Sequence, residues 1–245
     1  MGRGKIVGTI QPRSSTATFK KVAEILRTGT WELPTDGKYN GHGGPGRYLE
    51  DLLGIKANNA DAPDLGDWEI KFHGGNSLLT LFHKDPEPRG IIRAIVHDHG
   101  WDDSKGRISF RHTIGKETSR GFYVVNEGDR IVIRNRHKDA AVPHWDHNTL
   151  FNAFAAKLRR LIVVEGEVLK NPRRVIYKEA TAYWEPDIKG FMQAIADGLF
   201  YVDFDARTQK GRGSAIRNHG TKFRIKVEDL SIVYANKRKI TSHES

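Results

Sequence analysis

The most informative segment of the chain is Pro63-Asp64-Leu65-Gly66-Asp67-Trp68-Glu69-Ile70-Lys71. Polar and apolar residues alternate from its middle onward, which predicts a β-strand over residues 67–72. Side chains two residues apart on a strand point to the same face, so Glu69 and Lys71 share one face. Trp68 and the apolar residues at every second position would then fill the core on the other face. The segment therefore predicts an amphipathic strand that carries a carboxylate beside an ammonium group.

A second carboxylate, that of Asp64, lies in the turn that precedes this strand. Two convergent carboxylates suit Mg²⁺, a hard cation that prefers oxygen ligands. Lys71 beside them can orient or deprotonate an attacking water, or neutralise charge on a phosphate. We expect Asp64 and Glu69 to bind the metal. Together with Lys71 and the upstream Glu50, they form the catalytic set expected of a phosphodiester hydrolase.

The same pattern also fits a solvated strand with an ordinary Glu–Lys surface pair. At average residue usage, a chain of this length contains the bare pattern by chance in roughly half of cases. Three features of the context favour the catalytic interpretation. A Pro-Asp turn leads into the strand, the charged pair shares one face, and Glu50 lies upstream on a short predicted helix. For Glu50, a solvated position on that helix is the alternative.

The rest of the chain alternates predicted helices and strands. Helices are expected over residues 18–27, 47–53, 88–96, 148–160 and 186–196. Strands are expected over residues 67–72, 77–83, 107–113, 121–134, 161–165, 175–184, 199–205 and 221–227. Residues 77–83 are expected to form a hairpin with residues 67–72, and a Gly-Asp turn divides residues 121–134. This alternation predicts a mixed α/β fold in one compact unit with two lobes.

Composition excludes several classes of protein. The 245 residues contain no cysteine, which excludes disulfides, thiol nucleophiles and cysteine-bound zinc. The longest aliphatic run, residues 161–164, is far too short to cross a membrane, and the first 18 residues lack the apolar stretch of a secretory signal. A formal net charge of +10 favours a polyanionic partner. We therefore expect a cytoplasmic protein with no membrane association.

The positive charge is concentrated near the C-terminus. Residues 206–226 contain seven Lys or Arg and no acidic residue. Arginine suits guanine O6 and N7 in the major groove, aspartate can accept from cytosine N4, and lysine more often contacts phosphate. A solvated basic loop is the alternative. The residues that we expect to contact DNA are Asp205, Arg207, Arg212, Arg217, His219, Arg224 and His73.

Two other motifs indicate less. The glycine-rich run over residues 41–46 lacks the Gly-Lys-Ser/Thr of a P-loop, so no nucleoside triphosphate is expected to bind. A clamp on a DNA backbone is the preferred interpretation of this run. The pairs His97/His99 and His144/His147 lack further ligands at a suitable spacing, which disfavours structural zinc.

Five segments resemble the MvaI/BcnI-type restriction endonucleases, relatives of the MutH nicking enzyme in the PD-(D/E)xK nuclease superfamily. They are residues 47–53, 61–71, 79–82, 201–207 and 219–224. The resemblance implies a MutH-like α/β nuclease core, with a mixed sheet flanked by helices and two lobes around a DNA cleft. It implies a catalytic lobe over about residues 18–100 and a DNA-recognition lobe largely over about residues 198–228. It assigns Asp64, Glu69 and Lys71 to the catalytic motif and places Glu50 close by.

The resemblance also implies an activity. Such an enzyme is a Mg²⁺-dependent type II restriction endonuclease that leaves 5′-phosphate ends. It acts as a monomer that nicks each strand in turn, at a short pseudopalindromic duplex site of the CC/GG type with a variable centre. A cognate methyltransferase is implied in the same cell. One or two metal ions fit the motif equally well. A MutH-like mismatch-repair nickase and a DNA-binding module without catalysis are the alternatives.

Overall fold

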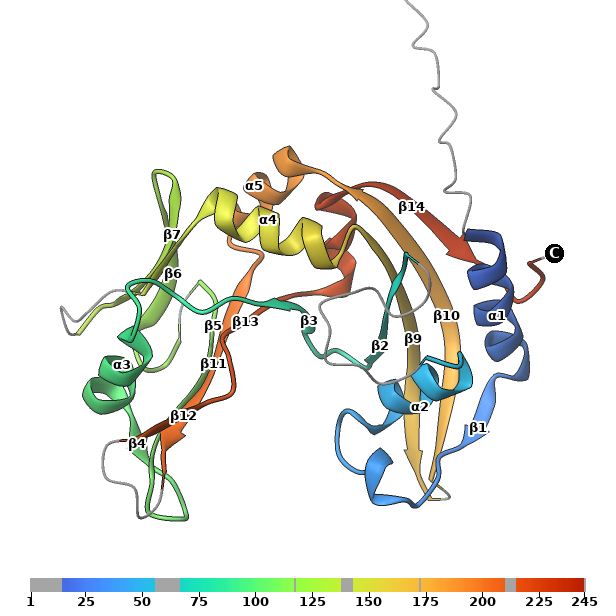
Figure 1. The fold of residues 1–245 in the computed structure, drawn as a ribbon, viewed down its shortest axis with the longest axis horizontal. Coiled ribbons are helices and arrows are strands. Elements are labelled where there is room, and N and C mark those ends of the chain that lie inside the picture. Colours follow the sequence, from blue (N-terminus) through green and yellow to red (C-terminus); the bar gives the residue numbers. More distant parts are fainter. Residues whose placement is uncertain are drawn as a thin grey trace, which may run out of the picture. The chain divides into compact units, whose positions relative to one another are not determined.

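The computed structural model describes residues 15–55, 67–116, 118–137, 143–171, 173–209 and 215–244. Its contacts divide the chain into two compact units (Figure 1). The first unit combines residues 1–75, 158–185 and 235–245, and the second combines residues 76–157 and 186–234. Both units are therefore built from segments that are distant in the sequence.

The first unit is a five-stranded sheet with two helices. Its helical elements are α1 (Ser15–Thr28), the 3₁₀ turn η1 (Gly37–Tyr39) and α2 (Gly44–Leu52). Its strands are β1 (Thr30–Glu32), β2 (Glu69–Gly74), β9 (Arg160–Lys170), β10 (Arg173–Pro186) and β14 (Tyr234–Ile240). The strand order is β1-β10-β9-β2, and β14 pairs with β10, as Figure 1 shows. β2 runs parallel to β9, whereas β10 is antiparallel to both β9 and β1.

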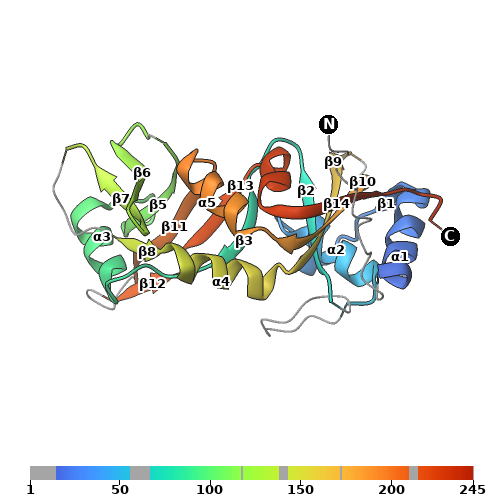
Figure 2. The same cartoon turned by 90° about the horizontal axis from the view of Figure 1, so that it is seen from above.

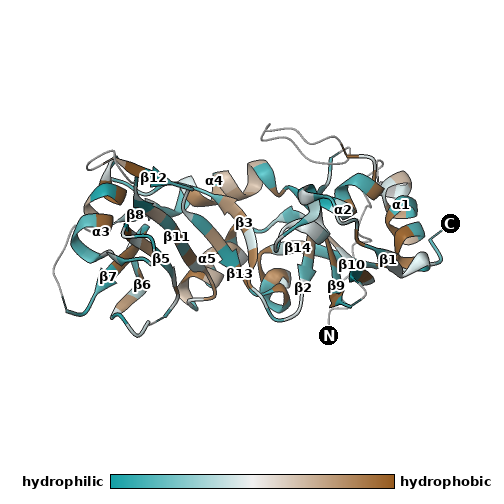
Figure 3. Ribbon diagram, turned by 90° about the horizontal axis from the view of Figure 1, so that it is seen from below, coloured by the Kyte–Doolittle hydropathy of each residue, from teal (hydrophilic) through white to brown (hydrophobic). Residues whose placement is uncertain are grey.

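One face of this sheet carries the core of the first unit. Trp68 and Ile70 are buried there with Phe19 of α1 and Leu49 of α2. The rings of Phe19 and Trp68 lie 5.3 Å apart. α1 packs on the sheet because its apolar residues recur at helical spacing. Figure 3 shows hydrophobic and hydrophilic residues interspersed along α1. The alternation in β2 thus places its odd-numbered side chains, including Glu69, on the opposite face.

The second unit contains a six-stranded and a three-stranded sheet. The first has the order β3-β13-β11-β5-β4, with β12 paired to β11, and the second has the order β6-β7-β8. The strands of the larger sheet are β3 (Leu79–His83), β4 (Trp101–Asp102), β5 (Ile108–Ile114), β11 (Tyr201–Thr208), β12 (Ile216–Asn218) and β13 (Lys222–Ile225). Those of the smaller sheet are β6 (Phe122–Glu127), β7 (Arg130–Asn135) and β8 (His144–Asp146). The helical elements are α3 (Ile91–His99), α4 (His147–Lys157), α5 (Ile188–Ala196) and the 3₁₀ helix η2 (Val227–Ile232).

The larger sheet of the second unit has one apolar and one charged face. Val202, Phe204 and Ala206 of β11 are buried, while the residues between them are half-buried and polar. α4 packs against β3 and beside α5, and Figure 2 shows the two helices next to each other. An antiparallel sheet can leave one face to solvent in this way, so the polar side chains of β11 share an open surface.

Most predicted elements are present, but the predicted hairpin of residues 67–72 with 77–83 is wrong. β2 pairs in parallel with β9, from Glu69 opposite Leu161 to Gly74 opposite Gly166. β3 belongs to the other sheet and pairs with β13. The apolar run at the start of β9 is fully buried, and its backbone pairs with that of β2 along one edge of the strand. Adjacent strands in the sequence do not reveal such a long-range pairing.

The glycine-rich run also differs from its predicted form. α2 begins at Gly44, so the second half of the run is helical and not loop. A Cβ atom on Gly44 would lie 1.8 Å from the backbone oxygen of Tyr39, which explains the need for glycine there. Among the residues that the structure describes, no helix has the length and apolar character needed to span a bilayer.

Candidate functional site

The β2 strand carries the predicted Glu69–Lys71 pair. Lys71 Nζ donates to Glu69 Oε1 at 2.9 Å. The Glu69 side chain is 7% exposed and that of Lys71 19%. A pair on a solvated strand would be far more exposed than these two side chains are. The strand instead holds a carboxylate and an ammonium group together at a largely buried position.

The donor set on β2 is compatible with a hard cation. Among the described residues, Lys71 is the one hydrogen-bond donor to the Glu69 carboxylate, and it donates to Oε1. Oε2 is therefore available to coordinate a cation. Carboxylate oxygens are the ligands that Mg²⁺ prefers. Asp64, the second predicted ligand, lies outside the described residues. Within the part of the chain that the structure describes, no group of three His, Asp or Glu could hold a metal. The described residues thus supply one carboxylate of such a site.

Glu50 lies on α2, the helix that packs against β2. Its side chain is half-buried, so it is not a fully solvated helix residue. The backbone oxygen of Glu50 accepts from Ile55 N at 2.9 Å, which closes the end of the helix. The structure therefore places Glu50 on the helix that packs against the strand of Glu69 and Lys71.

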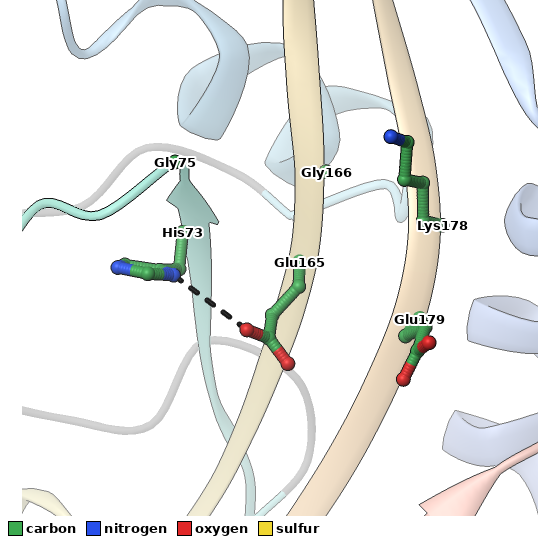
Figure 4. Close-up of a pocket in the computed structure, with 6 residues that line it drawn as sticks. All are labelled: His73, Gly75, Glu165, Gly166, Lys178 and Glu179. Atoms are coloured by element: carbon green, nitrogen blue, oxygen red, sulfur yellow. Dashed lines mark ion pairs between the residues drawn. The ribbon is translucent and has the colours of Figure 1, made fainter. Parts of the chain in front are cut away.

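His73 lies two residues beyond Lys71 on the same face of β2. It is 8% exposed, and its Nδ1 lies 3.7 Å from Glu165 Oε1 of β9. Figure 4 shows the Glu165 carboxylate turned toward the His73 ring. A pocket of about 310 Å³ is lined by His73, Gly75, Glu165, Gly166, Lys178 and Glu179. His73 is thus held inside the first unit, whereas the other described residues predicted to contact DNA belong to the second.

The charged face of the six-stranded sheet brings most of the predicted DNA-contacting residues together. β11 carries Asp205 and Arg207, and Arg207 lies opposite Arg217 of β12. Tyr201 of the same strand lies opposite Arg224 of β13. His219 follows β12 and is exposed. Arg212, a further predicted contact, lies outside the described residues.

Arg207 lies close to three other arginines on this face. Burial, and then the charges of Arg107, Arg111 and Arg217, lower the pKa of its guanidinium, while Asp205 acts in the opposite direction. Among the described residues, no carboxylate forms an ion pair with Arg207. Arginines crowded in this way repel one another, so the arrangement is typical of a surface that binds an anion.

Arg224 is held differently, by the protein itself. Its Nη2 donates to the backbone oxygen of Leu78 at 2.8 Å, and its Nη1 lies 3.7 Å from Asp203 Oδ2. Its Nε is buried and has no hydrogen-bond partner among the described residues. Arg224 therefore links β13 to the start of β3, and its guanidinium is less free than that of Arg207.

A carboxylate outside the predicted set holds the turn that carries His219. Asp85 accepts from Asn218 Nδ2 at 3.2 Å and from Thr221 N at 3.3 Å. Gly220, with a φ of 86°, donates its N–H to Asn218 Oδ1 at 3.0 Å. The turn between β12 and β13 is thus fixed by its own side chains and by a residue that follows β3.

β5 contributes to the charged face in a way that its sequence did not predict. Arg111 lies opposite Asp205 in the antiparallel register, and its Nε is 2.9 Å from Asp205 Oδ1. Arg107, just before β5, donates from Nε to Asp103 Oδ2 at 2.8 Å. The alternation of polar and apolar residues over 107–113 predicts the strand, but not the strand with which it pairs.

Both the sequence and the fold are similar to those of known proteins. The model described as the MvaI/BcnI restriction endonuclease family matches residues 19–234. The solved complex of restriction endonuclease MvaI with cognate DNA is 24% identical, with a TM-score of 0.79, over 95% of this chain and 100% of that one. The structure of MvaI in the absence of DNA is 25% identical, with a TM-score of 0.55 and the same coverage. No curated protein matches the sequence. The mixed α/β fold is therefore that of the MvaI structures.

Proposed function

Because the chain belongs to the MvaI/BcnI restriction endonuclease family and is a type II site-specific deoxyribonuclease, we propose that it hydrolyses duplex DNA through the β2 site. The observation that carries this proposal is the buried Glu69–Lys71 pair, with its 2.9 Å contact, on the strand whose sequence resembles the PD-(D/E)xK motif. Family membership favours a restriction enzyme over a repair nickase and over a module without catalysis.

We assign the catalytic roles to residues on and around β2. Glu69 and Asp64 would hold Mg²⁺, and the half-buried Glu50 of α2 is a candidate to support the same pocket. The metal, when bound, would stabilise the charges on the attacking and leaving oxygens. Lys71 would orient the attacking water and offset charge on the phosphate, because its ammonium group is held beside Glu69.

The charged face of the six-stranded sheet would bind the DNA. Arg207 and the exposed Arg217 and His219 have the chemistry for base edges and phosphates, and the crowding of cations around Arg207 supports an anionic ligand. The first unit would then supply the chemistry and the second most of the recognition. The separation of the chain into two compact units supports this proposal.

The finer details rest on the family resemblance. We propose that the enzyme acts as a monomer on a CC/GG-type pseudopalindromic site with a variable centre. It would nick each strand in turn and leave 5′-phosphate ends. A cognate methyltransferase would protect the DNA of the same cell.

Cleavage of plasmid DNA tests the proposal. Purified protein with Mg²⁺ should convert supercoiled plasmid into discrete fragments, and EDTA should prevent this. Sequencing the ends from a digest of a fully sequenced genome would give the site. Glu69→Gln should abolish the fragments, since it removes the carboxylate charge and keeps the shape of the side chain.

Glu167→Gln is the matched control. Glu167 lies on β9 of the same unit and pairs with Lys178 at 2.9 Å, but its side chain is 47% exposed. It should cleave as the wild type does. Fragments of equal intensity from Glu69→Gln and wild type would refute the assignment of the β2 site.

A further inference from the structure

The Arg111–Asp205 pair lies at the centre of the charged face. β5 and β11 are antiparallel, and the register places Arg111 directly opposite Asp205. Phe110 and Phe204, on the same two strands, point to the apolar face, where their rings lie 5.5 Å apart. The backbone of two core strands therefore fixes the position of both charged side chains, which is the precision that recognition of a base pair requires.

The carboxylates on this face indicate what kind of DNA group it contacts. Asp203 and Asp205 lie among the arginines and Lys222, whose Nζ is 3.6 Å from Asp203 and 3.9 Å from Asp205. A surface for phosphates alone gains nothing from carboxylates, because like charges repel. A base edge is different, since cytosine N4 and adenine N6 are donors that a carboxylate can accept. The mixed charges therefore favour contact with base edges in the major groove.

Arg111 pairs with Asp205 through its Nε, and no ion pair to its terminal nitrogens is formed by the residues that the structure describes. Its Nε lies 2.9 Å from Asp205 Oδ1, and among the described residues this is its one ion pair. The Arg111 side chain is 47% exposed and that of Asp205 28%, so a ligand can reach both. Asp205 Oδ1 is buried against Arg111, so a base edge would approach the carboxylate through Oδ2, which lies 3.9 Å from Lys222 Nζ. The pair thus offers donors and an acceptor side by side.

We propose that Arg111 is a specificity-determining residue that recognises one C·G base pair together with Asp205. Arg111 donates to guanine O6 and N7, and Asp205 accepts from the N4 amino group of the paired cytosine. This inference rests on the proposed function, because it assigns a base pair to the DNA-binding face. It adds β5 to a recognition surface that the sequence placed on residues 198–228.

Binding to a set of short duplexes tests this inference. The set contains the site found from the genome digest and variants with each base pair replaced in turn, measured in Ca²⁺ to prevent cleavage. Arg111→Ala should reduce discrimination at one G·C pair by about 5- to 150-fold and leave the other positions unchanged. Asp205→Asn, which exchanges one carboxylate oxygen for an amide donor, should lose discrimination at the same base pair.

Arg130→Ala is the matched control. Arg130 of β7 also pairs across strands with an aspartate, Asp146, at 3.1 Å, and its side chain is 51% exposed. Its removal takes away the same charge from the same unit, and should leave discrimination at every position unchanged. Arg111→Lys is the second variant, for the case that Arg111→Ala does not fold. It keeps the positive charge but lacks the planar guanidinium, and should also lose discrimination at that base pair.

Three outcomes would overturn the inference. A uniform loss over all duplexes, with a smaller salt dependence, would make Arg111 a phosphate contact. Unchanged discrimination would make its ion pair structural. Effects of Arg111→Ala and Asp205→Asn at different base pairs would separate the two residues. If the wild type cleaves no DNA at all, the proposed function itself fails. If the wild type cleaves at one site and the variants behave in one of these three ways, only the inference on Arg111 fails.

Discussion

The two units of the molecule each contain an ion pair with the same separation in a different environment. Lys71 and Glu69 lie 2.9 Å apart on one strand of the first unit, with side chains 19% and 7% exposed. Arg111 and Asp205 lie 2.9 Å apart on two strands of the second unit, with side chains 47% and 28% exposed. Desolvation makes a buried pair costly, and a hydrophobic pair of similar size is often as stable. The two pairs, for which we propose different roles, therefore differ in burial and not in distance.

Removal of Lys71 is the most severe test of the buried pair. Lys71→Ala should lower the rate of DNA cleavage by about 10²- to 10³-fold or more, because a positioned charge next to the reacting phosphate is lost. DNA affinity should change little, since the side chain is largely buried. Single-turnover cleavage and gel-shift binding in Ca²⁺ measure the two quantities separately.

Lys178→Ala serves as its control, because Lys178 also pairs with a glutamate at 2.9 Å on the same sheet but is 51% exposed. It should keep wild-type cleavage. A parallel loss of binding and cleavage in Lys71→Ala would show that the buried pair also contacts DNA.

Arg207 tests the recognition side of the comparison. Arg207→Ala should weaken binding to the cognate site by about 5- to 150-fold and leave non-specific binding almost unchanged, if the residue contacts a base. Fluorescence titrations on cognate and scrambled duplexes at two salt concentrations measure this. An equal loss on both duplexes would instead assign Arg207 to a phosphate.

Arg224 and Arg217 separate a structural arginine from a free one on the same face. Arg224→Ala removes the 2.8 Å hydrogen bond to Leu78 and should lower the free energy of unfolding by about 1.5–3 kcal/mol. Arg217 is exposed, and Arg217→Ala should change the free energy of unfolding by less than about 0.5 kcal/mol. Urea denaturation of both variants provides the measurement, and equal stabilities would contradict the structural role of Arg224.

The smallest effect concerns the apolar face of the same sheet. Burial, and then the charge of Arg120, lower the pKa of His112 below its ordinary value of 6.5. The unfolded chain therefore binds a proton more readily than the folded one as the pH falls through 6.5. The free energy of unfolding should decrease over that range and level off below the pKa of the folded state. His112→Phe should reduce this pH dependence in denaturation experiments at pH 5.5 and 7.5, and an unchanged slope would exclude His112 as its source.

Local patterns in the sequence were sufficient to predict most helices and strands, and to predict that Glu69 and Lys71 share one face of their strand. The alternation in residues 67–72 predicts the faces of β2, and the buried Glu69 beside Lys71 agrees with it. The pairing of β2 with β9 joins residues that are far apart in the chain, so the local sequence supported a hairpin that does not form. The position of Arg111 beside Asp205 could not be predicted for the same reason, because only the register of β5 with β11 brings the two residues together. The sequence therefore predicts the face of a strand to which a side chain points better than it predicts the residue that lies beside that side chain.

The parallel pairing of β2 with β9 has a consequence for synthesis of the enzyme. Glu69 and Lys71 leave the ribosome long before Leu161 and Val163, the residues opposite them. A chain that stops between these segments contains both charged residues but lacks the strand that seats them. An incomplete chain of this deoxyribonuclease therefore lacks the parallel ladder on which the Glu69–Lys71 pair is built.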